Sequence, residues 1–171
     1  MLNTLSDRIK LHEGFRERPY VCPTGHASIG YGCNLEAHPG YIADPATRRE
    51  VELGKLKGSE LVARLRGQGM FWTSACASAT LAIQLEDAEQ EVAERWPWAA
   101  GLFQARREVL VEMAFQMGAA KLATFRKFLA AAEAGDFERA AEEMLDSKWA
   151  RADSPDRAAE LANVMRVGGA P

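Results

Sequence analysis

The sequence predicts an α+β protein in which a small strand-bearing lobe is joined by a long helix to a mostly helical lobe. Residues 15–34 mix aromatic and β-branched side chains with proline and glycine, which is typical of short antiparallel strands joined by tight turns. Residues 73–96 carry apolar side chains at helical spacing without a break. Beyond Pro97 almost every segment again has the helical period, so the strands are confined to the first half of the chain.

The composition is that of an ordinary globular protein. Of the 171 residues, 47% are hydrophobic and 26% are charged, which is enough apolar material for one sizeable core. A net charge of −3 gives no reason to expect a nucleic-acid partner. No apolar run approaches the length of about 18 residues that a membrane span needs, and the first residues lack the apolar core of a signal peptide. We therefore expect a monomer that does not insert into membranes and stays in the cytoplasm until it is released.

The expected organisation is a single domain over residues 1–171 with two lobes. Its parts are a small lobe over about 14–72, a connecting helix over about 73–96, and a helical lobe over about 97–171 together with an N-terminal helix over 3–13. The N-terminal helix is expected to end at Gly14, because glycine readily takes the conformation that closes a helix.

Further helices are expected from apolar spacing and capping signals. They cover residues 60–66, 102–117, 122–134, 136–148 and a last segment that ends at Gly168-Gly169, whereas residues 36–58 are expected to form an irregular loop with a helical turn over 46–53. The last helix has the clearest start signal: Ser154 offers a capping hydroxyl, Pro155 takes the first helical position, and Asp156 places an acid in the first turn.

Glu13 is the first candidate for a catalytic group. It lies in the last turn of the N-terminal helix, where the negative end of the helix dipole favours the protonated form of a carboxyl group. A carboxyl group that holds its proton is suited to general acid catalysis. The alternative is a solvated surface glutamate, which is what most glutamates are.

Cys22 and Ser28 are the other two candidates. Cys22 lies at the expected end of a strand, where its thiolate would act as a base or nucleophile if a nearby arginine or His26 helped it to ionise. The alternative is a small buried apolar residue. The Ser28 hydroxyl is placed to hold a water molecule, or else it is the polar, outward-facing position of an alternating strand. An acid opposite such groups suits the cleavage of a glycosidic bond.

The cysteines and histidines do not indicate a disulfide framework or a metal site. The chain has three cysteines, Cys22, Cys33 and Cys76, and an odd number without a CxxC pair argues against both disulfides and structural zinc. The three histidines do not have the spacing of a standard metal-binding set. We expect neither a metal nor a cofactor.

The spacing of the three candidates resembles the catalytic pattern of phage-type lysozymes, the glycoside hydrolase family 24 endolysins. That pattern is Glu, eight residues, Asp or Cys, five residues, Thr, and here it reads Glu13, Cys22 and Ser28. Further blocks resemble the family in the same order along the chain. They are Ser28-Ile29-Gly30-Tyr31-Gly32, Phe115-Gln116-Met117-Gly118, Ser147-Lys148-Trp149 and Ser154-Pro155-Asp156-Arg157-Ala158.

The resemblance implies the family's lysozyme-like two-lobe α+β fold and hydrolysis of the β-1,4 bond between N-acetylmuramic acid and N-acetylglucosamine in peptidoglycan. Glu13 would protonate the leaving oxygen, Cys22 would take the place of the second catalytic group, and Ser28 would position water. The resemblance also implies substrate binding by Gly32, Phe115, Gln116 and Arg157, with Arg157 close to the catalytic glutamate. The implied partners are the peptidoglycan glycan strand and a holin, the membrane pore through which such enzymes are released.

Two departures from the family pattern leave other interpretations open. Cysteine in place of aspartate removes a permanent negative charge from beside the developing oxocarbenium ion, so the thiolate fraction should govern the rate. Serine in place of threonine loses the methyl group that restricts the side-chain rotamer. Besides an active endolysin, the chain is therefore consistent with a catalytically impaired lysozyme fold that binds peptidoglycan.

Two more questions remain open at the level of sequence. A cysteine hydrolase acting on wall peptides would need a histidine beside Cys22, and His26 is the nearest one along the chain. For a glycoside hydrolase, thiol attack on the sugar favours retention of the anomeric configuration, whereas thiol-assisted attack by water favours inversion.

Overall fold

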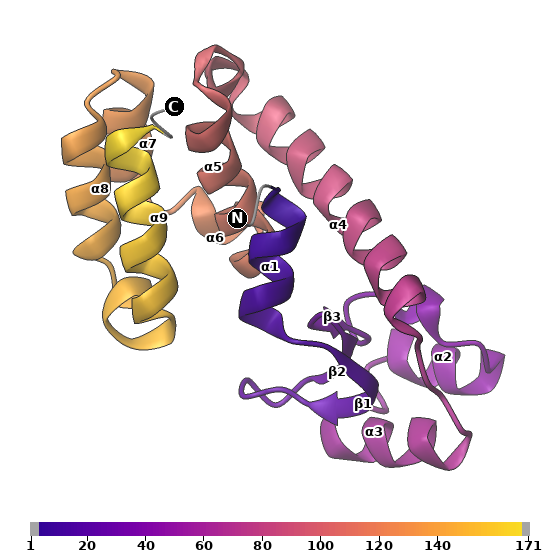
Figure 1. Cartoon of the computed structure of the whole chain (residues 1–171). Coiled ribbons are helices and arrows are strands. Elements are labelled where there is room, and N and C mark those ends of the chain that lie inside the picture. Colours follow the sequence, from indigo (N-terminus) through magenta and orange to yellow (C-terminus); the bar gives the residue numbers. More distant parts are fainter. Residues whose placement is uncertain (1–3, 169–171) are drawn as a thin grey trace. The chain divides into compact units, whose positions relative to one another are not determined.

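The computed structural model describes residues 4–168 of the chain, which forms two compact units that divide after Ile83 (Figure 1). The architecture is mostly helical with one small antiparallel sheet, so the predicted α+β class is confirmed. The expected lobe boundaries, and the expected place of the N-terminal helix in the helical lobe, stay predictions. Among the described residues no helix is long and apolar enough to cross a membrane.

The first helix, α1 (Leu5–Glu13), places Glu13 at its last position. The Thr4 hydroxyl accepts a hydrogen bond from the Asp7 N–H at its start, at 3.1 Å. Gly14 ends the helix with a φ of 65°, and its N–H donates to the Lys10 carbonyl. The predicted glycine end is thus confirmed, whereas the predicted start at residue 3 lies outside the described residues. A functional group at the end of a capped helix has a well-defined direction.

Three strands follow in the order β1-β2-β3, each antiparallel to its neighbour. They are β1 (Arg16–Val21), β2 (Ala27–Gly30) and β3 (Cys33–Asn34). Tyr20 pairs with Ser28 across β1 and β2, and an irregularity in the register lies between Arg16 and Tyr20. All four residues of β2 are buried: the strand has a neighbour on each side, and its Ala27 and Ile29 side chains belong to the core to which α3 contributes.

The rest of the first unit encloses a core under the sheet. Its helices are η1 (Pro39–Tyr41), α2 (Pro45–Glu52) and α3 (Gly58–Gly67), and α3 packs against β1 and β2. The helix predicted over 60–66 is present within α3, whereas the helical turn expected over 46–53 is the eight-residue helix α2, whose start the Asp44 side chain caps. The core is formed by Ala27, Ile29, Cys33, Leu35, Ile42, Val51, Leu56, Leu61, Val62, Leu65, Trp72 and Ala77.

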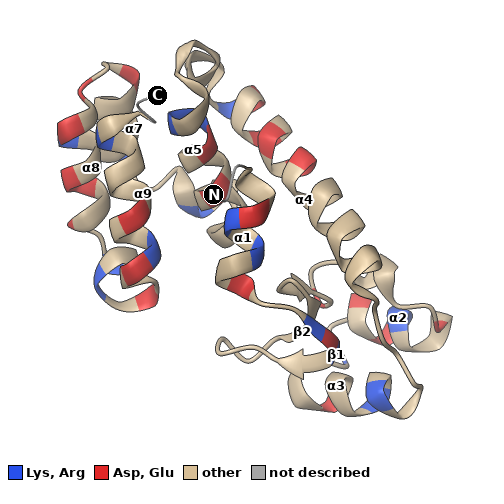
Figure 2. Ribbon diagram, viewed as in Figure 1, with Lys and Arg blue, Asp and Glu red and all other residues tan. Residues whose placement is uncertain are grey.

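The long helix α4 (Ser74–Arg95) crosses the division between the two units. Its predicted apolar stripe is buried, as Leu81, Leu85, Ala88 and Val92 show. Its exposed positions carry a series of acidic residues (Figure 2), namely Glu86, Asp87, Glu89, Glu91 and Glu94. Proline at position 97 prevents the helix from continuing, as expected.

The second unit is helical throughout its described part. Its elements are η2 (Pro97–Gly101), α5 (Gln104–Met117), α6 (Ala119–Leu122), α7 (Arg126–Glu133), α8 (Phe137–Leu145), the π-helical turn η3 (Trp149–Asp153) and α9 (Pro155–Val167). The helix α8 packs against α7 and α9, and α5 packs against α6 and α9. The predicted end at Gly168 is confirmed, with a left-handed φ of 70°, while Gly169 lies outside the described residues.

Two predicted helices have different ends, and hydroxyl groups account for both. The helix predicted over 122–134 begins only at Arg126, because the Thr124 hydroxyl donates to the Lys121 carbonyl at 2.7 Å and closes α6. The helix predicted over 136–148 ends at Leu145. There the Ser147 hydroxyl donates to the Met144 carbonyl at 2.6 Å and accepts from the Ala150 N–H at 3.1 Å, which ends one helix and opens the next turn.

Candidate active site

The carboxyl group of Glu13 lies directly against the backbone of Gly32. A Cβ atom placed on Gly32 would lie 2.9 Å from Glu13 Oε2, and the φ of 79° at this position also disfavours any other residue. Glu13 itself is half-buried. The helix end and the segment between β2 and β3 therefore meet at the carboxyl group that the sequence singles out.

Cys22 begins the turn between β1 and β2, and hydrogen-bond donors surround its sulfur. The turn is closed by bonds from the Cys22 N–H to the His26 carbonyl and from the Gly25 N–H to the Cys22 carbonyl, both at 2.8 Å. Cys22 Sγ lies 3.0 Å from Thr24 Oγ1. Burial acts to raise the pKa of the thiol, but hydrogen bonds from Thr24, from the His26 backbone and from Ser28 together lower the pKa below its ordinary value.

Ser28 lies on the same face of the sheet as Cys22, for a reason of register. Ser28 is opposite Tyr20, and Cys22 is two residues beyond Tyr20, so their side chains are diagonal neighbours. The Ser28 hydroxyl contacts the Cys22 thiol, and the residue is only 2% exposed. The interpretation of Ser28 as an outward-facing polar position is therefore wrong, because β2 is covered on both faces.

The half-buried phenol of Tyr20 interacts electrostatically with both Glu13 and Cys22. Burial raises its pKa, and the negative charges of Glu13 and Cys22 raise it further, while the Arg16 guanidinium, 5.7 Å from the ring centroid, acts in the opposite direction. Tyr20 thus keeps its proton and stays uncharged beside them. The structure accordingly brings Glu13, Cys22 and Ser28 into one neighbourhood of the first unit.

A known protein family matches a segment of the chain that includes Glu13, Cys22 and Ser28. The family model for phage lysozyme matches residues 10–163 of the chain. The chain belongs to the phage lysozyme family. A similar protein is the pre-baseplate central spike protein Gp5 of Enterobacteria phage T4, which is 27% identical over 165 residues. That alignment covers 96% of this chain and 28% of the spike protein.

In this phage lysozyme family member, Gln116 is held by two partners within the second unit. Its Nε2 group donates to Ser154 Oγ at 2.6 Å, and its Oε1 accepts from the Trp149 indole N–H at 3.2 Å. The predicted cap of α9 by the Ser154 side chain is wrong, because that hydroxyl bonds Gln116 and makes no capping hydrogen bond. Phe115, the neighbouring candidate, is half-buried.

Arg157, the remaining candidate, is buried in the second unit beside an acid that the sequence analysis did not select. Its Nε lies 3.9 Å from Glu112 Oε1, and the exposed fractions of the two side chains are 8% and 0%. A charged residue inside the apolar run Val109–Ala114 is the signal that could have identified Glu112. The expected approach of Arg157 to Glu13 stays a prediction.

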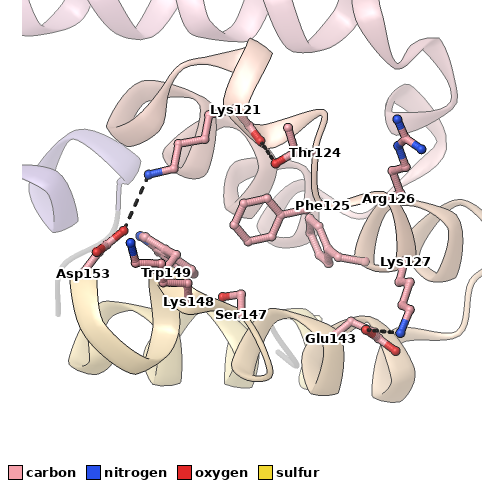
Figure 3. A pocket seen from close by; sticks show the side chains of 11 residues that line it. Lys121, Thr124, Phe125, Arg126, Lys127, Glu143, Ser147, Lys148, Trp149 and Asp153 are labelled. Carbon is pink, nitrogen blue, oxygen red and sulfur yellow. Dashed lines mark hydrogen bonds and ion pairs between the residues drawn. The ribbon is translucent and has the colours of Figure 1, made fainter.

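A pocket of about 600 Å³ lies in the second unit (Figure 3). The rings of Phe125 and Trp149 form one part of its wall, with centroids 6.4 Å apart. Its lining carries charges of both signs, which form two ion pairs: Lys121 Nζ lies 3.6 Å from Asp153 Oδ2, and Lys127 Nζ lies 3.9 Å from Glu143 Oε2. Glu13, Cys22 and Ser28 are not among the residues that line it.

His26 is engaged by an acid rather than by the thiol. Its Nδ1 lies 2.9 Å from Glu36 Oε2, and no side-chain hydrogen bond joins His26 to Cys22 among the described residues. The direct thiol–imidazole contact that a cysteine hydrolase needs is thus not formed. Thr24 and Glu36 were both missed by the sequence analysis, because neither belongs to the spacing pattern and each acts through the folded turn.

Proposed function

We propose that the protein is a muramidase that hydrolyses the β-1,4 bond between N-acetylmuramic acid and N-acetylglucosamine in peptidoglycan. Such a reaction needs one group that protonates the leaving oxygen and a second group on the opposite face of the sugar. The observation that carries the proposal is the thiol of Cys22, which is surrounded by donors that favour its negative form in the same neighbourhood as Glu13.

Glu13 is the proposed proton donor, and Cys22 the proposed second group. The lowered pKa of Cys22 increases the fraction of thiolate at a given pH relative to an ordinary thiol, and that thiolate would serve electrostatically in place of a carboxylate beside an oxocarbenium-like centre. Ser28 helps to hold that charge through its contact with the thiol. Its role in positioning water stays a prediction.

The thiolate has two routes open to it. As a nucleophile it forms a sulfur–carbon bond while the glycosidic oxygen leaves with the proton of Glu13, and water then releases the sugar with retention. As a base it takes a proton from water that attacks the sugar carbon directly, which gives inversion. The anomeric configuration of the first product, measured by proton NMR, separates the two.

Substitution of Glu13 by glutamine tests the proposal. Glu13→Gln should remove essentially all hydrolysis of purified sacculi, a loss of at least about a thousandfold, while the fold and its melting temperature are kept. Glu17→Gln is the matched control, because Glu17 is an exposed glutamate four residues away on β1. Full activity of Glu13→Gln would show that the reaction does not use this carboxyl group.

A catalytically impaired protein that binds peptidoglycan is the alternative, and its cue is the pair of substitutions at Cys22 and Ser28. The lowered pKa of Cys22 supports the active enzyme over this alternative, since it increases the thiolate fraction that could replace the missing charge. A turbidity assay on permeabilised Gram-negative cells, run beside a pull-down on sacculi, separates them. Binding without clearing would favour the impaired module.

We further propose that the muramidase serves as an endolysin in host cell lysis, with a holin as the partner that releases it. The similarity to a baseplate spike protein suggests a second use of the same chemistry, in a virus particle. Mass spectrometry of purified particles beside lysates distinguishes the two, because an endolysin accumulates in the lysate and a spike component is retained in the particle.

A further inference from the structure

The turn Cys22–His26, which carries the proposed catalytic thiol, has little apolar packing of its own. Four of its five residues, Pro23 to His26, are exposed. Burial therefore contributes little to its conformation, and polar contacts must hold it. Two backbone hydrogen bonds close the turn on itself, but they do not fix it relative to the rest of the unit.

Glu36 supplies the contacts that do so. Its Oε2 lies 2.9 Å from His26 Nδ1 in the turn. Its Oε1 accepts hydrogen bonds from the Ala27 N–H at 2.9 Å and from the Gly58 N–H at 2.8 Å. One carboxylate thus ties the turn to the start of β2 and to the first residue of α3, and hydrogen bonds to an ionised acceptor are among the stronger ones.

Glu36 is itself held in place from both sides. Asn34 Oδ1 accepts from the Glu36 N–H at 2.9 Å and from the Ala37 N–H at 3.2 Å, which fixes the backbone after β3. On the other side Gly58 approaches the turn so closely that an added Cβ would lie 3.1 Å from the Gly25 carbonyl oxygen. The carboxylate therefore lies between two fixed backbone segments and the turn.

We propose that Glu36 is a positioning residue for Cys22, because it fixes the turn that places hydrogen-bond donors around the thiol. Two of those donors, the Thr24 hydroxyl and the His26 backbone, belong to the turn itself. Release of the turn would withdraw them from the sulfur together. This inference rests on the proposed function only in so far as Cys22 takes part in the reaction.

The charges around the pair support the assignment. The groups that act on His26 are Glu36, Cys22 and Lys57, and the contact with Glu36 raises the pKa of His26 against the opposing effects of burial and Lys57. Burial acts to raise the pKa of Glu36, but hydrogen bonds from His26, Ala27 and Gly58 lower it. Both partners thus keep their charges over a wider range of pH than they would alone.

The test measures the reactivity of Cys22 directly and does not need muramidase activity. In a Cys76→Ser background, iodoacetamide alkylation of Cys22 is followed by mass spectrometry across a pH series, for the parent protein, Glu36→Ala and Glu36→Gln. Glu36→Ala should slow alkylation at pH 7 by about threefold to tenfold and move the profile to higher pH. Glu36→Gln should recover most of the rate, because an amide still offers an acceptor oxygen to two N–H groups.

Glu50→Gln is the matched control, since Glu50 is a glutamate of the same unit that is not part of the turn. Its Oε2 lies 3.0 Å from Nη1 of Arg64. Should Glu36→Ala not fold, His26→Gln releases the turn at an exposed position and is expected to shift the alkylation profile in the same direction. An alkylation profile of Cys22 that stays unchanged in the folded variant used would overturn the proposal.

Hydrolysis of sacculi by the same variants separates this inference from the proposed function. If Cys22 acts in the reaction, kcat should fall with its alkylation rate in Glu36→Ala while KM changes less than about twofold. If the alkylation profile shifts but the parent protein hydrolyses nothing, Glu36 positions the thiol as proposed and the muramidase assignment fails.

Discussion

The Glu13 carboxyl group lies where a side chain at position 32 would be, and only glycine leaves room for it: a Cβ atom on Gly32 would lie 2.9 Å from Glu13 Oε2. That separation is shorter than carbon and oxygen normally approach without a bond. The two residues come from different elements, the end of α1 and the segment between β2 and β3. The place of the proposed proton donor therefore depends on a glycine that the family resemblance assigns to substrate binding.

Replacement of this glycine is expected to affect activity more than stability. Gly32→Ala meets a positive φ, which costs about 1 to 2 kcal/mol of unfolding free energy, and it pushes the Glu13 carboxyl group away. Hydrolysis of sacculi should fall by at least about tenfold, because proton donation depends on position. Gly54→Ala has a similar φ of 67° with open space around it, so it should lose comparable stability and keep its activity. Equal activity of the two variants would contradict the proposed contact.

The lowered pKa of Cys22 predicts how its reactivity depends on pH. Thiolate forms as pH rises through the pKa, so alkylation of Cys22 should rise and then level off at a lower pH than for an ordinary thiol. Thr24→Val removes the hydroxyl at 3.0 Å from the sulfur and should move the whole curve to higher pH. Thr124→Val, which removes a hydroxyl in the second unit, should leave the curve unchanged. A curve unaffected by Thr24→Val would show that this hydroxyl does not stabilise the thiolate.

The pair of His26 and Glu36 predicts a limited pH range of stabilisation. The pKa of His26 is raised, so its contribution to the unfolding free energy is complete below the ordinary value of about 6.5 and is lost as pH rises through the raised pKa. The pKa of Glu36 is lowered, so its contribution is lost as pH falls through the lowered value. Urea unfolding of the parent protein and His26→Gln should differ most between these two limits and converge at high pH.

The control for this measurement is His38→Gln, which changes an exposed histidine whose ring centroid lies 6.1 Å from that of Tyr41. Its stability relative to the parent protein should not follow the pattern of His26→Gln. A difference for His26→Gln that stays constant from acidic to alkaline pH would contradict the charged pair.

Arg106 is expected to be the strongest single polar contributor to the stability of the second unit. Its Nε donates to the Met165 carbonyl at 2.8 Å and its Nη2 to the Arg166 carbonyl at 2.9 Å, while the guanidinium lies 3.6 Å from the Phe137 ring centroid. Arg106→Met should therefore cost about 2 to 3 kcal/mol. Arg107→Met, at the adjacent exposed position, should change the melting temperature little. A similar effect of the two variants would show that the end of α9 does not depend on Arg106.

Local patterns in the sequence account for most of the helices and strands. The stripe of Leu81, Leu85, Ala88 and Val92 has the period of a helix, and Pro97 cannot continue one, so α4 could be predicted nearly to the residue. Helix ends that depend on side-chain hydroxyls were less predictable. Thr124 and Ser147 bond carbonyl groups that a propensity argument treats as part of an unbroken helix.

The candidate site also has features that the sequence predicts and features that it does not. Glu13, Cys22 and Ser28 could be selected from the sequence because their spacing resembles the catalytic pattern of the phage-type lysozymes. The burial of Ser28 was not predictable, since Ser28 alternates with the core residues Ala27 and Ile29 and only the folded chain buries the other face of β2 as well. The predicted cap by Ser154 is wrong for a different reason, because its hydroxyl accepts a hydrogen bond from Gln116, which lies far away in the sequence.

By itself the sequence determined the class of fold, the order of its elements and the residues that resemble a catalytic set, because periodicity, turn residues and spacing are local properties of a chain. Only the tertiary structure decided which groups surround the Cys22 sulfur, which carboxylate holds its turn, and why position 32 is a glycine. Those facts depend on contacts between segments far apart in the chain, and the energy of such contacts is set by distances that no local pattern encodes.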